Sequence, residues 1–131
     1  MIKVVAGLII DCEQRILACR RADDRHLGGK WEFPGGKLES DESPNQALVR
    51  ELQEELGITV KPGRMMTPVV HDYGRGPIQL IPIVCSISFG EPQAIEHSEI
   101  RWCHVDELSQ LDLAAADLPI LAEWKQSAPQ L

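Results

Sequence analysis

One helix with both ends specified by the sequence constrains this chain more than any other feature. Ser43 suits the N-cap, Pro44 suits the first helical position, and Gln46 can complete a capping box with Ser43. Gly57 stands where a left-handed C-terminal cap is wanted. The sequence therefore predicts a helix over residues 44–56.

This helix has an apolar face and an acidic face. Leu48, Leu52 and Leu56 recur every four residues, so they share one face that we expect to pack on a core. Beside that face lie three carboxylates, those of Glu51, Glu54 and Glu55. Alone, they would most often be a solvated acidic surface. A divalent cation is the alternative, because Mg²⁺ binds carboxylate oxygens together with the oxygens of substrate phosphates.

The three carboxylates belong to a longer pattern with fixed spacing. Its positions are Gly36, Glu42, Arg50, Glu51, Leu52, Glu54, Glu55, Gly57 and Ile58. They match the Nudix box over residues 36–58 without a mismatch, which is far more specific than a short glycine motif. The chain resembles Nudix hydrolases of the MutT-type and CTP pyrophosphohydrolase branch, roughly from Lys3 to Lys125.

The resemblance implies an α/β fold in which a mixed central β-sheet is sandwiched between helices. The order of expected elements agrees with it, because strands lie on both sides of the central helix and another helix ends the chain. At 131 residues the chain has the size of one domain, and we expect residues 1–131 to form a single Nudix domain.

The resemblance also implies a metal-dependent hydrolase. The implied ligands of Mg²⁺, or of Mn²⁺, are Glu51, Glu54, Glu55 and the carbonyl oxygen of Gly35. Arg50 would orient Glu51, and Glu42 would lie behind the ligands or bind a further metal. The metals would activate a water for in-line attack on a nucleoside diphosphate derivative, without a covalent intermediate.

A catalytic base is expected in the loop before the penultimate strand. In the MutT-like branch a glutamate of this loop reaches the metal cluster, and Glu96 matches its position. Glu99 is the competing residue, and from the sequence alone either one reads as a solvated acid. His97 reads as a surface histidine.

Basic residues that precede or enter the box are candidates for the substrate phosphates. Arg21, and less strongly Arg20, follow a strand, and guanidinium groups match phosphate oxygens. His26 is a weaker candidate, and Lys37 either approaches phosphate or only pairs with Glu39.

The base of the nucleotide is expected near Phe33 and Asp117. The Phe33 backbone and the segment 115–119 resemble the base-reading parts of this branch. A carboxylate at Asp117 would accept from the exocyclic amine of cytosine, although guanine or 8-oxoguanine would also satisfy it. Alternatively, Asp117 only caps the last helix. Trp31 and Trp102 are expected in the core.

Composition restricts the partners and the compartment. The net charge of −7 argues against a nucleic-acid polymer or an anionic membrane as partner, and a small nucleotide fits better. The four cysteines show no metal or disulfide pattern, so they read as buried thiols of a reducing compartment. With no signal peptide or membrane span recognisable, we expect a cytoplasmic protein, as a monomer or weak homodimer.

Hydrophobic patterns and turn residues predict the remaining elements. Expected strands cover residues 2–10, 15–20 (pairing back on the first), 31–33, 58–60, 65–71, 78–89 and 99–104. Expected turns cover residues 34–36 and 61–63, with Pro82 marking an edge or a bulge. Expected helices cover residues 105–111 and 114–125, ahead of a frayed tail at 127–131.

Three functions remain open at this stage. The favoured one is hydrolysis of a (d)CTP-like or 8-oxo-dGTP-like nucleoside triphosphate to the monophosphate and pyrophosphate, which clears unwanted nucleotides. The second is hydrolysis of ADP-ribose or a dinucleoside polyphosphate, which Tyr73 keeps open because some such subfamilies carry a marker residue in this region. The third is a nucleotide-binding module without catalysis, which the complete box disfavours.

Overall fold

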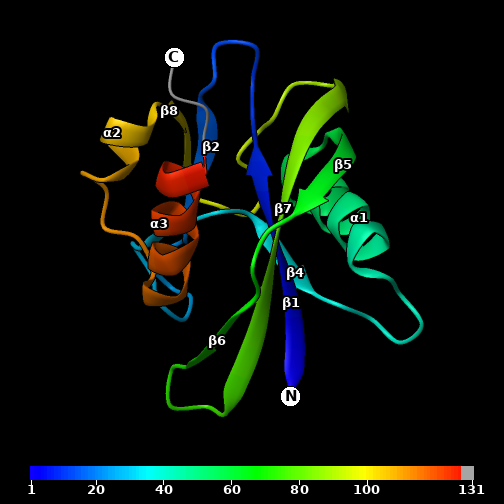
Figure 1. Ribbon diagram of the computed structural model, residues 1–131, viewed down its shortest axis with the longest axis vertical. Helices are drawn as coiled ribbons and strands as arrows, with labels where there is room; N and C mark the ends of the chain where they lie inside the picture. Colours follow the sequence, from blue (N-terminus) through cyan, green and yellow to red (C-terminus); the bar gives the residue numbers. More distant parts are fainter. Residues whose placement is uncertain (128–131) are drawn as a thin grey trace.

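The computed structural model describes residues 1–127 (Figure 1). Its strands are β1 (Ile2–Ile9), β2 (Ile16–Arg20), β3 (Trp31–Glu32), β4 (Gly35–Lys37), β5 (Thr59–Met65), β6 (Val69–Asp72), β7 (Pro77–Phe89) and β8 (Glu99–Cys103). Its helices are α1 (Pro44–Leu56), α2 (Val105–Leu108) and α3 (Leu118–Ser127), with a 3₁₀ turn, η1 (Ala115–Asp117), before α3.

The strands form two sheets. The larger sheet has the order β4-β1-β7-β5, and β6 also pairs with β7. Because β1 and β7 run parallel while the other pairs are antiparallel, this sheet is mixed, as expected. The smaller sheet, β3-β2-β8, is antiparallel. Helices α1 and α3 lie on opposite sides of the larger sheet (Figure 1), which confirms the sandwich.

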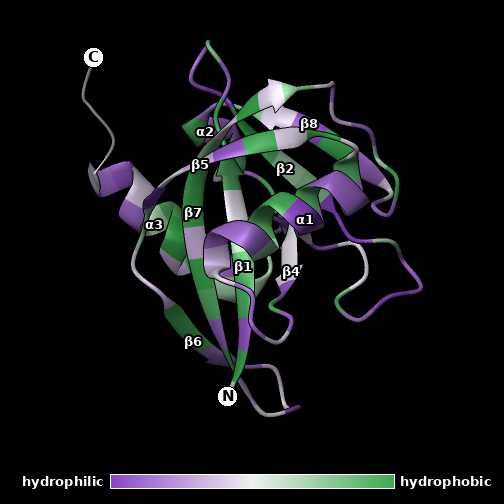
Figure 2. Ribbon diagram, turned by 90° about the vertical axis from the view of Figure 1, so that its right-hand side faces the viewer, coloured by the Kyte–Doolittle hydropathy of each residue, from purple (hydrophilic) through white to green (hydrophobic). Residues whose placement is uncertain are grey.

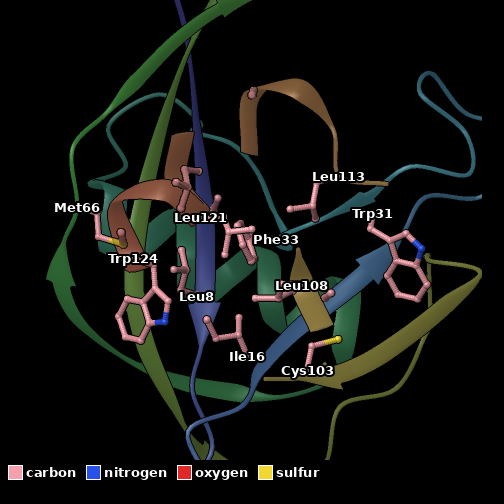
Figure 3. Packing of buried hydrophobic residues seen from close by; sticks show 14 of the residues in the cluster. Leu8, Ile16, Trp31, Phe33, Met66, Cys103, Leu108, Leu113, Leu121 and Trp124 are labelled. Carbon is pink, nitrogen blue, oxygen red and sulfur yellow. The ribbon is translucent and has the colours of Figure 1, made fainter. Parts of the chain in front are cut away.

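Strand β1 separates two hydrophobic cores. Its alternate residues Ala6 and Leu8 belong to the core beneath α3, which Figure 3 shows with Leu8, Leu121 and Trp124 packed together. Val5 and Ile9 belong to the other core, beneath α1. Both sets are buried, so the centre of β1 is covered on both faces, which suits its run of β-branched and other apolar residues.

The expected ends of α1 are confirmed. The Ser43 hydroxyl accepts from the Gln46 backbone N–H at 3.1 Å, and the Gln46 side chain accepts from the Ser43 N–H at 2.9 Å. Gly57 adopts a left-handed φ of 71°, which ends the helix. The three leucines of the apolar face are fully buried, whereas the outer face is hydrophilic (Figure 2).

Two expectations about the first half of the chain were wrong. Strand β2 does not pair back on β1 beyond the single bridge Ile10–Ile16; it pairs with β3 and β8 in the other sheet. The Gly35-Gly36 segment is not a turn but strand β4, paired antiparallel with β1. The two glycines were predicted as part of a turn, whereas in the strand they are needed because groups of the protein itself, from Val5 and Glu51, approach their backbone closely.

Expectations about residues 61–82 were also partly wrong. Residues 61–63 continue β5 through a register shift between Pro62 and Met65, and the next strand is limited to β6. Pro82 lies inside the central strand β7, not at an edge. Its carbonyl accepts from the Met66 N–H at 2.8 Å, between the residues where β5 ends and β6 begins. The ladder is thus interrupted beside the residue that lacks an N–H.

The C-terminal helices are shorter than expected, and α2 ends at Leu108. The expected helix over 114–125 is divided into η1 and α3, and α3 runs on to Ser127, which was expected to belong to the tail; residues 128–131 lie outside the described residues. All four cysteines are free, and three are buried, but Cys12 is exposed in the turn after β1. No helix within residues 1–127 is long and apolar enough to cross a membrane.

Candidate active site

A pocket of about 490 Å³ opens between the box helix and the C-terminal 3₁₀ turn. Strands β1, β3 and β4, the loop after β2 and the β6–β7 hairpin also contribute to its wall. The polar side chains that line it are Arg21, Arg25, His26, Glu32, Lys37, Glu51, Glu54, Glu55, Tyr73, Arg75, Glu96 and Asp117. The box carboxylates therefore share one cavity with the residues expected to read phosphate and base.

Arg50 holds several groups of the box together. Its Nε and Nη2 atoms donate to the two carboxylate oxygens of Glu42 at 2.7 and 2.9 Å. Its Nη1 atom donates to Glu51 at 2.9 Å and more weakly to Glu54 at 3.4 Å. The guanidinium also donates to the Lys37 carbonyl at 3.0 Å, which fixes β4 to α1. Arg50 thereby orients Glu51 and lowers the pKa of Glu42 to about 2.

The two glycines of β4 are required by close approaches. A side chain at Gly36 would overlap the carboxylate of Glu51, which lies directly against the β4 backbone. A side chain at Gly35 would overlap the backbone carbonyl of Val5 in the neighbouring strand. The glycines thus let α1 lie against the sheet with Glu51 at the bottom of the pocket.

Glu55 is a partly buried acid among other acids. Burial is the main cause that raises its pKa to about 9, with the charges of Glu32, Glu51 and Glu96 adding to the effect. The N–H of Gly35 acts in the opposite direction. One carboxyl oxygen of Glu55, Oε2, is buried without a hydrogen-bond partner. A group that carries positive charge would satisfy this oxygen.

The two candidates for a base lie in different places. Glu96 lines the pocket, and its charge contributes to raised pKa values at Glu51 and Glu55, so it faces the box. Glu99 forms an exposed pair with Arg101 at 3.0 Å and does not line the pocket. The geometry therefore favours Glu96.

At the other end of the pocket, Asp117 is buried, with 4% of its surface exposed. Burial and the nearby Glu32 raise the pKa of Asp117 well above its usual range, while the Phe33 N–H opposes that shift. Within residues 1–127 no hydrogen bond joins the Asp117 side chain to an amide of α3, so helix capping does not explain this residue. Tyr73 accepts from the Ala116 N–H at 2.7 Å and so holds the 3₁₀ turn that carries Asp117.

The comparison with protein families decides the assignment. The NUDIX domain model matches residues 5–123, which include every element from β1 to most of α3. The chain belongs to the Nudix family. It is therefore a hydrolase of that family, with the box described above as its signature.

Individual Nudix relatives agree along nearly the whole chain. The CTP pyrophosphohydrolase of Escherichia coli (strain K12) is 42% identical over 121 residues, which cover 92% of this chain and 89% of that protein. The 8-oxo-dGTP diphosphatase of the same strain is 34% identical over 125 residues, covering 95% and 97%. The solution structure of the E. coli ORF135 protein has a TM-score of 0.81 at 38% identity, covering 100% of this chain and 95% of that one.

Nudix hydrolases generally use divalent metal ions, and the box residues fit one. The donors around the pocket floor are all carboxylate oxygens, as hard divalent cations prefer, and one of them is the buried, unpartnered Oε2 of Glu55. Within residues 1–127 no three acidic, histidine or cysteine side chains already converge as a finished ligand set. Glu54 in particular is more than half exposed and bonded to Arg50. The Gly35 carbonyl as a ligand stays a prediction.

The basic side chains in and near the Nudix pocket differ in whether they are already bound to other groups of the protein. Arg21 lines the pocket but is already engaged, since its Nε donates to the His26 carbonyl at 2.7 Å and its Nη1 to Glu32 at 3.0 Å. Arg20 does not line the pocket; it bonds to the Gly29 carbonyl and lies near Asp23. Lys37 lines the pocket, and within residues 1–127 its ammonium group forms no hydrogen bond or ion pair with another side chain. Arg20 is the candidate that the structure removes, because it does not line the pocket.

Sequence reasoning missed Glu32, Arg25 and Arg75. Glu32 is the most informative omission, because its two oxygens bind Arg21 and His97. Its neighbours Trp31 and Phe33 are buried, with 7% and 3% of their surface exposed. Adjacent residues of a strand point to opposite faces, so these neighbours gave no signal for Glu32. His97 is likewise buried, contrary to the expectation of a surface histidine.

Proposed function

We propose that this Nudix hydrolase is a Mg²⁺-dependent nucleoside triphosphate pyrophosphohydrolase that releases the monophosphate and pyrophosphate. Its substrates are (d)CTP-like or oxidised nucleotides such as 8-oxo-dGTP, and its role is clearing them from the nucleotide pool. The observation that carries the proposal is one pocket with the acidic box at one end and the buried carboxyl of Asp117 at the other.

The acidic end supplies the hydrolytic chemistry. Glu51, Glu54, Glu55 and Glu96 are the proposed ligands of Mg²⁺, or of Mn²⁺, together with the Gly35 carbonyl. A bound divalent ion there would neutralise phosphate charge and acidify a water. The protein's own contribution is to hold Glu51 in place through Arg50 and to leave a carboxylate, that of Glu96, facing the box as base. Lys37 and Arg21 contribute positive charge for the phosphates, and His26 lies beside them.

The other end is proposed to select the base. Burial raises the pKa of the Asp117 carboxyl and so favours its protonated form, which offers one donor and one acceptor side by side. The N3 atom and the 4-amino group of cytosine match this pair. The O6 atom and the N1–H of 8-oxoguanine match it as well, so the two substrate classes compete for the same group. Over more than nine-tenths of the chain, the identity to a CTP pyrophosphohydrolase, 42%, is higher than the 34% to an 8-oxo-dGTP diphosphatase, which favours cytidine nucleotides.

A substrate panel tests this function. The purified protein with Mg²⁺ would be given CTP, dCTP, 5-methyl-dCTP, dGTP, 8-oxo-dGTP and ADP-ribose, and products would be separated by anion exchange. We expect one triphosphate to have the highest kcat/KM and to yield monophosphate and pyrophosphate. Cleavage of ADP-ribose alone would instead support the second function, for which Tyr73 supplies little, since its hydroxyl is engaged with Ala116.

A matched pair of variants tests the base contact. Asp117→Asn keeps a donor and an acceptor in the same place, whereas Asp117→Leu removes both. We expect Asp117→Leu to lower kcat/KM for the preferred base by the equivalent of about 1–3 kcal/mol. Asp117→Asn should retain most of the wild-type kcat/KM for that base. Equal kcat/KM for both variants and the wild type would exclude Asp117 from base selection.

A further inference from the structure

The segment that carries Glu96 has little to hold it in place. Residues 90–98 connect β7 to β8 without regular structure, and all but two of them, Pro92 and His97, are exposed. Backbone bonds tie it to the rest of the protein at two points: the Gln93 N–H donates to the Leu56 carbonyl at 3.0 Å, and the Ser98 N–H donates to the Arg20 carbonyl at 2.9 Å. The Ile95 N–H bonds only within the segment, to the Gln93 carbonyl at 2.9 Å. Glu96 stands between these points, so its direction depends on what holds the residues beside it.

His97 is the buried anchor of this segment. Only 5% of its side chain is exposed, and its Nε2 atom lies 2.9 Å from Oε2 of Glu32. The Glu32 side chain is itself 16% exposed and projects from β3, a strand of the rigid smaller sheet. Hydrogen bonds that involve a carboxylate are short and strong, and burial protects this one from water.

Glu32 is fixed from its other side as well. Its Oε1 atom accepts from Nη1 of Arg21 at 3.0 Å, and Arg21 is tied to the His26 carbonyl. The carboxylate therefore cannot turn away from His97 without also breaking its ion pair with Arg21. The only ion pair of the Glu96 side chain itself within the described residues is a long one of 3.9 Å to Arg25, with both groups largely in solvent. Such an exposed pair contributes little to orientation.

We propose that His97, held by Glu32, is a positioning residue that keeps Glu96 directed toward the box carboxylates. The inference rests on the role proposed above for Glu96. Fixing the His97 side chain fixes the backbone from which Glu96 projects, because the two residues are neighbours. Glu32 thus links the acidic end of the pocket to the loop after β2 that carries Arg21. His97 acts only through Glu96.

Three substitutions separate hydrogen bonding from volume. His97→Leu keeps an apolar body but has no donor. His97→Gln places an amide N–H at about the reach of the histidine Nε2, and His97→Asn carries the same amide on a side chain one methylene shorter. Thermal unfolding of each purified variant establishes that it is folded. His97→Asn keeps the test available if His97→Leu does not fold.

The first readout is Mn²⁺ binding, followed by electron paramagnetic resonance, with Mn²⁺ alone as the probe. Losing an outer partner of a metal site typically costs about 10–100-fold in metal affinity or activity. We expect His97→Leu and His97→Asn to weaken Mn²⁺ binding as Glu96→Gln does, and His97→Gln to recover most of the loss. Wild-type affinity in both His97→Leu and His97→Asn would overturn the proposal.

The second readout is a kinetic cycle with Glu96→Gln. If His97 acts through Glu96, His97→Asn lowers kcat in the wild-type background with little change in KM, and lowers it no further in Glu96→Gln. Equal losses in both backgrounds would contradict the proposal. The Mn²⁺ measurement needs no substrate. Failure of the wild type to hydrolyse any triphosphate would therefore refute the proposed function while Mn²⁺ binding still decided the role of His97.

Discussion

The guanidinium of Arg50 binds both carboxylate oxygens of Glu42, at 2.7 Å from Nε and 2.9 Å from Nη2. This fork leaves the Nη1 atom to donate to Glu51 at 2.9 Å. Glu42 precedes α1 and Glu51 lies within it, so one side chain fixes the connector and orients a proposed metal ligand. The box pattern is therefore a single hydrogen-bonded unit rather than a series of separate acids.

Replacing Arg50 by lysine tests this unit. An ammonium group carries the charge but cannot bind both oxygens of Glu42 and reach Glu51 as well. We expect Arg50→Lys to lower kcat by about 10–100-fold while KM changes little. Arg15→Lys, which alters another arginine–carboxylate pair at the turn after β1, is the matched control. Full activity in Arg50→Lys would contradict the role assigned to the fork.

Alanine at the two β4 glycines should have different effects. At Gly36 the new methyl group would overlap the end of the Glu51 side chain, which can move away. We expect Gly36→Ala to fold normally and to lose activity because Glu51 is displaced. At Gly35 the methyl group would overlap the Val5 carbonyl, which belongs to the sheet, so Gly35→Ala should lower the unfolding temperature. Thermal unfolding and kcat, measured on both variants, distinguish these outcomes.

Much of the fold followed from local chemistry, and the errors share one cause. The capped helix α1 and the buried strand β1 were predicted because caps and hydrophobic periodicity are local signals. The pairing of β2 with β8 was missed because partners distant in the sequence leave no such signal. Glycine at positions 35 and 36 was misread for the same reason, since the atoms that require it come from Val5 and Glu51.

The residues of the site likewise divide into those that a sequence pattern marks and those that it does not. The box residues and Glu96 were found because a fixed spacing, or the family pattern, marks them. Glu32 and His97 carry no motif, and their meaning depends on a hydrogen bond between residues in different strands and loops. The buried neighbours Trp31 and Phe33 do not reveal the role of Glu32, because adjacent residues of a strand point to opposite faces.

The metal-free protein should lose stability as pH rises. The pKa of Glu55 is raised from 4.5 to about 9, so above pH 4.5 the folded state keeps a proton that the unfolded chain releases. Stability therefore falls between these two pH values. In EDTA, we expect Glu55→Gln to unfold at the wild-type temperature near pH 5 and at a higher temperature near pH 9. Parallel pH profiles for the two proteins would show that Glu55 ionises normally.

Tyr73→Phe should destabilise the protein without changing its hydrophobic packing. The substitution removes the acceptor for the Ala116 N–H, and Ala116 is only 3% exposed. A buried donor left without a partner costs about 1–3 kcal/mol. Urea unfolding should show this loss in the free energy of unfolding. An unchanged midpoint would mean that the N–H finds water instead, and that Tyr73 does not hold the turn beside Asp117.

The most direct test of the account is the hydrolysis rate of Glu54→Gln. Glu54 is largely exposed, so the loss of its charge should leave the unfolding temperature close to that of the wild type. If the box carboxylates hold the catalytic metal, Glu54→Gln abolishes Mg²⁺-dependent pyrophosphate release from the best triphosphate, while Glu91→Gln, an exposed acid outside the pocket, does not. Near-normal pyrophosphate release by a folded Glu54→Gln variant would contradict the metal assignment and the mechanism built on it.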